Sequence, residues 1–195
     1  MTTVHLIYAH AKHNSYNAAL KDTLTTQLKK AGHTVIISDL YADAPQLQTF
    51  YGHELSAEQQ NYIKAEQAKI KSARFTVVQF PMYWFSFPAI LKNYFDLVYA
   101  HGFAYPGRFA ESPLNDGRQV MLSITTQSTK EDFSDSGCNG NIEKILYPME
   151  LAFKFVGYKI APAEVYYAVG STTNEERQQQ MLHFNDKVIS TIEKI

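Results

Sequence analysis

The chain has 195 residues, of which 45% are hydrophobic and 19% charged, and its formal net charge is −1 at pH 7. This length suits one domain with a well-buried core and is short for two, so we expect a single domain over residues 1–195. The composition is typical of a soluble globular protein, and the near-zero charge gives no general attraction to nucleic acid or anionic lipid.

Short apolar runs rich in β-branched residues alternate with helical patterns along the chain. The expected strands are residues 4–9, 35–40, 75–80, 119–126 and 159–169. The expected helices run up to Gly32, from Ser56 to about Ser72, from near Pro88 to Val98, over residues 142–156, and from Thr173 onward. This order predicts an α/β, flavodoxin-like fold, in which a five-stranded parallel sheet of order 2-1-3-4-5 carries helices on both faces.

Local signals mark several of these boundaries. Capping-box patterns precede two helices, at residues 56–59 and 173–176. Pro148 could interrupt the helix over residues 142–156, and Pro162 breaks the fifth strand. In the last helix an apolar stripe is predicted from Met181, Phe184, Val188, Ile192 and Ile195.

Cysteine usage and the N-terminus bear on location. Cys138 is the only cysteine, so no intrachain disulfide can form, which fits a reducing compartment. The N-terminus lacks a secretory pattern, and no apolar run approaches membrane-spanning length. A cytoplasmic location is therefore expected.

Ligands of such sheets bind beyond the carboxyl ends of the strands, near the point where the strand order reverses. Three connections reach that edge: residues 10–17, 81–88 and 125–140. Eleven aromatic residues lie within the thirty positions from Phe80 to Phe109, around the second connection. This density favours a platform for a flat ligand over an ordinary core.

The first connection, HAKHNSYN, delivers Ser15 and Asn17 to the start of a helix, where free N–H groups and the helix dipole favour a phosphate. His10, Asn14 and Ser15 could add side-chain donors. The loop holds no glycine, so it is neither a dinucleotide fingerprint nor a Walker loop. The alternative is that Ser15 or Asn17 only caps the helix, and that His10 and His13, which lack a third metal ligand at a supporting spacing, face solvent.

The second and third connections differ in character. The second, PMYWFSFP, offers Tyr83, Trp84 and Phe85 between two prolines, as a surface on which a planar, electron-poor ring could stack. Ordinary core positions are expected instead for the aromatics near helical spacing, Phe87, Tyr94 and Phe95. The third is polar and long, which is typical of a functional loop, with surface decoration as the alternative.

The run QFPMYWFSFPAILKNYFDLV, followed by HGFAY, resembles the flavin-dependent NAD(P)H:quinone oxidoreductases of the DT-diaphorase type. The segments YAHAKHNSYN, SDLYA, SITT and FVGYKI fall in the order that this family shows. The similarity covers nearly the whole chain apart from residues 46–54, which look shortened. It implies a homodimer with two sites at the interface, each using parts of both chains.

The resemblance also implies roles for individual residues. The flavin-phosphate loop is matched by His10, Ser15, Tyr16 and Asn17. The segment along the isoalloxazine ring is matched by Pro81, Met82, Tyr83, Trp84 and Phe85. The turn at the pyrimidine end of the flavin is matched by Thr125, Thr126, Gln127 and Ser128. Tyr105 and Phe155 match aromatics that sandwich nicotinamide or quinone across the dimer interface, and Arg177 matches a helix residue near the far end of the dinucleotide.

Two departures from the family pattern fall in the third connection. Gln127 and Ser128 stand where the family commonly has a glycine pair, which can alter the approach of the ring. Phe133 and Asn139 stand where it commonly has a tyrosine and a histidine that support the reduced flavin. Phe133 has no hydroxyl, and Asn139 can donate a hydrogen bond but cannot carry a proton near neutral pH. These changes put the family's typical rate of quinone reduction in question.

We interpret the sequence as that of an NAD(P)H-dependent flavoprotein that passes two electrons to a quinone or similar acceptor by a ping-pong route. The backbone of residues 126–128 would support the reduced pyrimidine edge. FAD is preferred because the first connection and SDLYA look closest to FAD-binding members, whereas shorter bacterial relatives use FMN. One alternative is a flavin-binding ancillary subunit of a potassium efflux antiporter, with a membrane-protein partner. The other is a one-electron carrier, disfavoured because such carriers tend to be strongly acidic.

Overall fold

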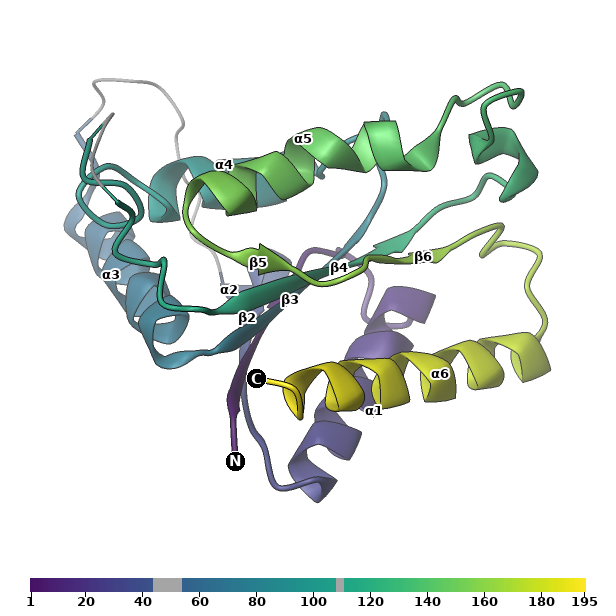
Figure 1. Ribbon diagram of the computed structural model, residues 1–195, viewed down its shortest axis with the longest axis horizontal. Helices are drawn as coiled ribbons and strands as arrows, with labels where there is room; N and C mark the ends of the chain where they lie inside the picture. Colours follow the sequence, from purple (N-terminus) through teal and green to yellow (C-terminus); the bar gives the residue numbers. More distant parts are fainter. Residues whose placement is uncertain (44–53, 108–110) are drawn as a thin grey trace.

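The computed structural model describes residues 1–43, 54–107 and 111–195 and shows a parallel sheet between two layers of helices (Figure 1). The elements in chain order are β1 (Thr3–Tyr8), α1 (Tyr16–Lys30), β2 (Thr34–Asp39), α2 (Leu40–Asp43), α3 (Ala57–Ser72), β3 (Phe75–Pro81), α4 (Ala89–Val98), β4 (Gln119–Thr125), the short 3-10 helix η1 (Glu131–Phe133), α5 (Ile142–Phe155), β5 (Lys159–Ile160), β6 (Glu164–Tyr166) and α6 (Asn174–Ile192). The strand order is β2-β1-β3-β4-β5, and β6 also pairs with β4. The predicted flavodoxin-like fold and the order 2-1-3-4-5 are confirmed.

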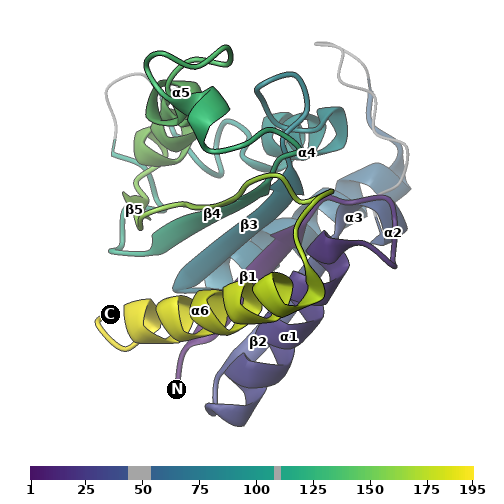
Figure 2. The same cartoon turned by 90° about the vertical axis from the view of Figure 1, so that its right-hand side faces the viewer.

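Each face of the sheet buries a separate apolar cluster. Helices α3, α4 and α5 cover one face, and α1 and α6 cover the other (Figures 1 and 2). On β4, Met121 points to the α1 and α6 side, while Val120 and Leu122 point to the opposite cluster. Successive side chains of a strand point to opposite faces of the sheet, and here both faces are covered by helices. Both sets of side chains are therefore apolar, which explains the nearly continuous apolar runs of β3 and β4.

The two capping boxes predicted from sequence are both present. Ser56 Oγ accepts the backbone N–H of Gln59, and the Gln59 side chain accepts the Ser56 N–H. Thr173 and Glu176 form the same reciprocal pair at the start of α6. Both helices therefore begin where the sequence predicts.

Among the later elements, the break predicted at Pro162 is present, and the position of Ile195 was predicted wrongly. Two short strands, β5 and β6, lie on either side of Pro162, which removes a ladder donor, and both pair with β4, so the described sheet has six strands rather than five. Helix α5 continues through Pro148, which is exposed, so water can satisfy the carbonyl four residues earlier. Ile195 does not extend the apolar stripe of α6, because the helix ends at Ile192 and Ile195 is exposed.

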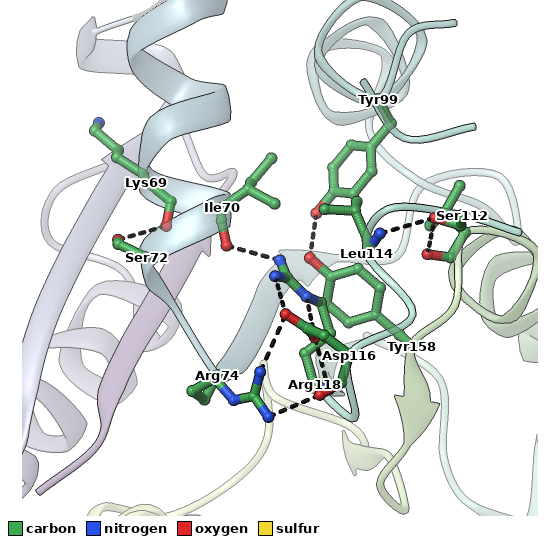
Figure 3. Close-up of polar contacts among 11 residues, drawn as sticks. Lys69, Ile70, Ser72, Arg74, Tyr99, Ser112, Leu114, Asp116, Arg118 and Tyr158 are labelled. Atoms are coloured by element: carbon green, nitrogen blue, oxygen red, sulfur yellow. Dashed lines mark hydrogen bonds and ion pairs between the residues drawn. The ribbon is translucent and has the colours of Figure 1, made fainter. Parts of the chain in front are cut away.

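A polar cluster closes the amino ends of β3 and β4, away from the edge where ligands bind (Figure 3). The guanidinium of buried Arg118 donates to both carboxylate oxygens of Asp116, at 2.8 and 2.7 Å, and to the carbonyl of Ile70 at 2.8 Å. Arg74 reaches the Asp116 carboxylate at 3.0 Å. These hydrogen bonds hold the pKa of Asp116 down at about 2. The cluster ties the end of α3 to the start of β4.

Residues 46–53, most of the stretch that looks shortened, lie outside the described residues. Among the helices of the described ranges, none combines the length and apolarity needed to cross a membrane.

Candidate functional site

The three connections singled out in the sequence meet at the carboxyl ends of β1, β3 and β4 and enclose a cavity of about 360 Å³, which we call the three-loop cavity. It is lined by His10, Lys12, Asn14, Ser15, Tyr16, Asn17, Pro81, Met82, Tyr83, Thr125, Thr126, Gln127, Val169 and Arg177. Most of the residues assigned to a flavin from the sequence are therefore brought together. Lys12 and Val169 are additional lining residues that the sequence reasoning missed.

The N-terminus of α1 forms one wall of the three-loop cavity. Ser15 is the N-cap, and its Oγ accepts the backbone N–H of Ala18 at 3.1 Å. The predicted capping role is therefore real, yet it uses only one of the first-turn donors, and the N–H groups of Tyr16 and Asn17 have no partner within the helix. An anion placed here would meet free N–H groups and the positive end of the helix dipole.

The charge of the three-loop cavity favours an anion. Lys12 and Arg177 contribute cationic side chains, and no carboxylate is among the residues that line it. His10 Nδ1 accepts the backbone N–H of Lys12 at 3.0 Å, and burial lowers the pKa of His10, so the ring is neutral near pH 7. Across the described ranges, no three His, Cys, Asp or Glu side chains gather closely enough to hold a metal ion.

Tyr16 and Arg177, 161 positions apart in the chain, meet at one end of the cavity. The guanidinium carbon of Arg177 lies 5.6 Å from the centre of the Tyr16 ring, and Arg177 Nη2 donates to the carbonyl of Val169 at 2.8 Å. The Tyr16 hydroxyl donates to Gln180 Oε1 at 2.7 Å, and burial raises its pKa above the ordinary value. The corner therefore presents a fixed cation and a neutral phenol.

A chain of hydrogen-bonded, buried polar side chains runs from the wall of the cavity into the sheet. Asn17 Nδ2 donates to Thr125 Oγ1 at 2.6 Å, and Gln79 Nε2 donates to the backbone carbonyl of Asn17 at 2.5 Å. Gln79 was missed in the sequence, although a polar residue in the middle of the strand FTVVQFP was a signal that could have found it.

The second connection divides between two hollows. Pro81, Met82 and Tyr83 line the three-loop cavity, whereas Trp84 is 94% exposed and lines a separate groove. Reciprocal backbone hydrogen bonds between Tyr83 and Ser86 close a turn whose two central residues, Trp84 and Phe85, have φ of 50° and 58°. Positive φ is rare for bulky residues, and such strain concentrates at functional sites. The three consecutive aromatics thus do not form one common platform in the single chain.

The third connection is fastened to the segment that precedes α6. The Thr126 N–H donates to the Tyr166 carbonyl at 2.9 Å, and the Ser128 N–H lies 3.3 Å from the Thr126 hydroxyl. The Gln127 N–H makes no hydrogen bond to another described residue, so it is the donor of this turn that remains available. A Cβ atom at position 170 would lie 2.6 Å from the Gln127 side-chain oxygen, so the glycine there leaves room for the Gln127 side chain.

Tyr105 and Phe155 lie together, away from the three-loop cavity. Their ring centres are 5.8 Å apart, and they border a hollow of about 860 Å³ between α4 and α5. Trp84 and Tyr83 border an adjoining hollow of about 730 Å³. Both hollows share the walls Phe95, Asp96, Pro148 and Ala152, and we call them together the α4–α5 groove. Tyr83 lines both this groove and the three-loop cavity.

The aromatics expected in the core behave unequally. Tyr94 is buried, as predicted. Phe87 packs edge-to-face on Phe80 at 5.1 Å, and Phe95 stacks on Tyr99 at 4.5 Å, but both are only partly buried and also line the α4–α5 groove.

Phe133 and Asn139 do not line the three-loop cavity. Phe133 is buried, with its ring centre 5.9 Å from that of Tyr167. The Asn139 backbone N–H donates to the Asp132 carbonyl at 2.9 Å, and its side-chain oxygen lies 3.6 Å from the Cys138 sulfur. Their expected roles beside a reduced flavin stay predictions.

A model of the flavodoxin-like fold family matches residues 2–188 of the chain. Human ribosyldihydronicotinamide dehydrogenase [quinone] is 31% identical over 206 residues, which cover 94% of this chain and 89% of that protein. Rat NAD(P)H dehydrogenase [quinone] 1 is 32% identical over 197 residues, which cover 89% of this chain and 72% of that protein. The chain belongs to the flavodoxin-like NAD(P)H:quinone oxidoreductase family.

A solved structure of a putative quinone reductase from Klebsiella pneumoniae fits the same family. It superimposes with a TM-score of 0.84 at 30% identity, covering 98% of this chain and 85% of that one. All three of these NAD(P)H:quinone oxidoreductase relatives bear the names of quinone-acting enzymes, which favours an oxidoreductase over an ancillary subunit of a potassium efflux system.

Proposed function

We propose that this chain is a flavin-dependent oxidoreductase that transfers two electrons from NADH or NADPH to a quinone or a related acceptor. In the balanced reaction, NAD(P)H and one proton convert the quinone to a hydroquinone, and NAD(P)⁺ is released. The observation that carries the proposal is the three-loop cavity, where a helix N-terminus, two cations and a loop rich in aromatic residues converge at the strand ends of a quinone-oxidoreductase relative.

The chemistry of the lining residues fits a flavin. At one end, the first-turn N–H groups of α1, the Ser15 hydroxyl and the positive charge of Arg177 suit a phosphate. At the other end, the side chains of Pro81, Met82 and Tyr83 supply contact surface for a ring, and Gln127 supplies a free backbone N–H. A bound flavin would supply the redox chemistry, by accepting a hydride and returning two electrons.

The chain's own residues have three tasks in this scheme. The phosphate end anchors the cofactor, because Lys12 and Arg177 offset its charge. The Gln127 N–H is the donor left free to stabilise negative charge on the pyrimidine edge. Residues Tyr105 and Phe155 would cover the substrate, and Asn139 would approach the ring, once the second subunit is in place.

For the cofactor we propose FAD, with FMN as the alternative. The corner made by Tyr16, Arg177 and Gln180 adds an aromatic ring, a cation and an amide beside the phosphate end, and the second half of FAD would give these groups a binding partner that FMN lacks. Release of the cofactor by heat and chromatography of the extract against both flavins separates the two.

We further propose a cytoplasmic, single-domain homodimer in which the α4–α5 groove faces the partner subunit. The groove is largely apolar, and Phe155, Leu151 and Tyr147 on α5 are exposed in the single chain. Covering such a face is favourable because apolar surface leaves water. This arrangement would also join Trp84 and Phe155, which line the two hollows of the groove, to one site.

A steady-state assay tests the proposed function. Initial rates are measured while NADH or NADPH is varied at several concentrations of a soluble benzoquinone. Because one face of a flavin cannot hold nicotinamide and quinone together, parallel double-reciprocal lines are expected. Absence of quinone-dependent oxidation of either nucleotide by flavin-loaded protein would refute the proposal.

A further inference from the structure

Gln79 is a fully buried polar residue in an otherwise apolar strand. It lies in the middle of the sheet, paired in register with Tyr8 on β1 and Ser123 on β4, and none of its surface is exposed. Burying an amide without hydrogen bonds costs free energy. The Gln79 side-chain oxygen has no hydrogen-bond partner among the described residues, so the contact made by its Nε2 is what holds the amide in place.

That contact reaches the phosphate end of the three-loop cavity. Gln79 Nε2 donates to the backbone carbonyl of Asn17 at 2.5 Å and lies 3.5 Å from Asn17 Oδ1. Asn17 is the second residue of α1, and its own Nδ2 donates to Thr125 Oγ1 at 2.6 Å. One amide in β3 is thus linked to the first turn of α1 and, through Asn17, to the end of β4.

We infer that Gln79 is a positioning residue for phosphate binding: it holds the first turn of α1 so that the N–H groups of Tyr16 and Asn17 face the cofactor phosphate. This inference rests on the proposed function, because the phosphate is that of the proposed flavin. Gln79 is not among the residues that line the cavity, so it acts through Asn17.

The geometry makes the effect specific to the phosphate. A hydrogen bond to a backbone carbonyl fixes the helix itself, and the direction of the first-turn N–H groups follows from the position of that turn. The ring end of the cavity is built from residues 81–83 and 125–127, which keep their own backbone hydrogen bonds, including Met82 N–H to the Thr125 carbonyl at 2.8 Å. Loss of the Gln79 amide should therefore weaken the hold on a phosphate and leave ring binding nearly unchanged.

The test compares FMN with riboflavin, which has the same ring and no phosphate. Dissociation constants for both are measured by flavin fluorescence on flavin-stripped protein for the wild type and for Gln79→Met, which keeps the side-chain length and removes the donor. Thr76→Val is the matched control, because Thr76 is a buried polar residue of the same strand, three positions away. A second variant, Gln79→Asn, keeps the amide but is too short to reach Asn17.

In Gln79→Met and Gln79→Asn the dissociation constant for FMN should rise about tenfold, whereas that for riboflavin should change less than about twofold. Thr76→Val should change neither dissociation constant. An equal rise for both flavins, or no rise in a folded variant, overturns the inference. If neither Gln79 variant folds, NMR of the wild type provides the test. The Gln79 side-chain amide protons should exchange with solvent more slowly with FMN bound than with riboflavin bound. Equal exchange rates overturn the inference.

The wild-type measurements separate this inference from the proposed function. A wild type that binds neither flavin refutes the proposed function and the inference together. A wild type that binds riboflavin as tightly as FMN leaves a flavin enzyme standing and overturns the inference alone.

Discussion

Asn17→Asp places a negative charge inside the three-loop cavity with almost no change of shape. Asn17 is 3% exposed, lines the cavity and donates to the Thr125 hydroxyl at 2.6 Å. A hydroxyl can donate as well as accept, so the Thr125 proton can turn toward the new carboxylate and keep the contact. The variant should therefore fold, and the main change is electrostatic.

The size of the effect follows from Coulomb's law. Two like unit charges about 5 Å apart at an effective dielectric constant of about 20 repel each other by about 3 kcal/mol. A penalty of about 3 kcal/mol raises a dissociation constant by about two orders of magnitude. The phosphate of FMN should feel this repulsion, whereas riboflavin should bind nearly as it does to the wild type.

Flavin fluorescence titrations of flavin-stripped protein measure the effect for Asn17→Asp. The matched control is Asn185→Asp, since Asn185 is equally buried at 3% but lies in α6 and does not line the cavity. Lowering the pH through the pKa of the new carboxyl should restore FMN affinity, because protonation removes the charge. Unchanged FMN affinity in a folded Asn17→Asp, or an equal loss in Asn185→Asp, would refute the placement of the phosphate at α1.

Three further predictions test other parts of the structure. The pKa of Asp116 is about 2 in the folded state against an ordinary 3.8, so its carboxylate stabilises the fold above about pH 3.8, and this stability is lost as the pH falls toward 2. Acid unfolding of Asp116→Asn should therefore depend less on pH in that window than acid unfolding of the wild type. Identical profiles for the two proteins would count against the ion pair. The double variant Trp84→Asn, Phe85→Gly places residues that tolerate positive φ in the turn, so the free energy of unfolding should rise by about 1 kcal/mol or more, seen as a higher Tm, while quinone reduction falls. A lower Tm would contradict the proposed backbone strain. Light scattering should show a monomer for Phe155→Glu and a dimer for the control Leu182→Glu, which changes an exposed apolar residue of α6. A Phe155→Glu protein that stays dimeric would show that the α4–α5 groove is not part of the interface.

Sequence patterns predicted those parts of the molecule that depend on local spacing. The apolar runs located the first four strands of the sheet to within a residue, and the capping boxes at residues 56–59 and 173–176 located two helix starts. Because parallel strands bring their carboxyl ends to one edge, the three connections could also be expected to meet.

Sequence patterns could not decide the features that depend on tertiary contacts. Pro148 is tolerated because the surface of α5 can hydrate the freed carbonyl, which no local pattern reveals. The role inferred for Gln79 depends on its hydrogen bond to Asn17, which is 62 positions away in the chain. Trp84 was grouped with Tyr83 by adjacency, yet Tyr83 borders the three-loop cavity as well as the α4–α5 groove, whereas Trp84 borders the groove and not the cavity.

The central claim is that a flavin held in this chain carries electrons from NAD(P)H to a quinone. The most direct measurement follows the visible absorbance of the flavin-loaded protein under anaerobic conditions, first with one equivalent of NADH or NADPH and then with one equivalent of benzoquinone. The account predicts bleaching by the nucleotide and full recovery of the absorbance by the quinone, with no stable one-electron species between. Flavin that stays oxidised with both nucleotides, or reduced flavin that quinone does not reoxidise, would contradict it.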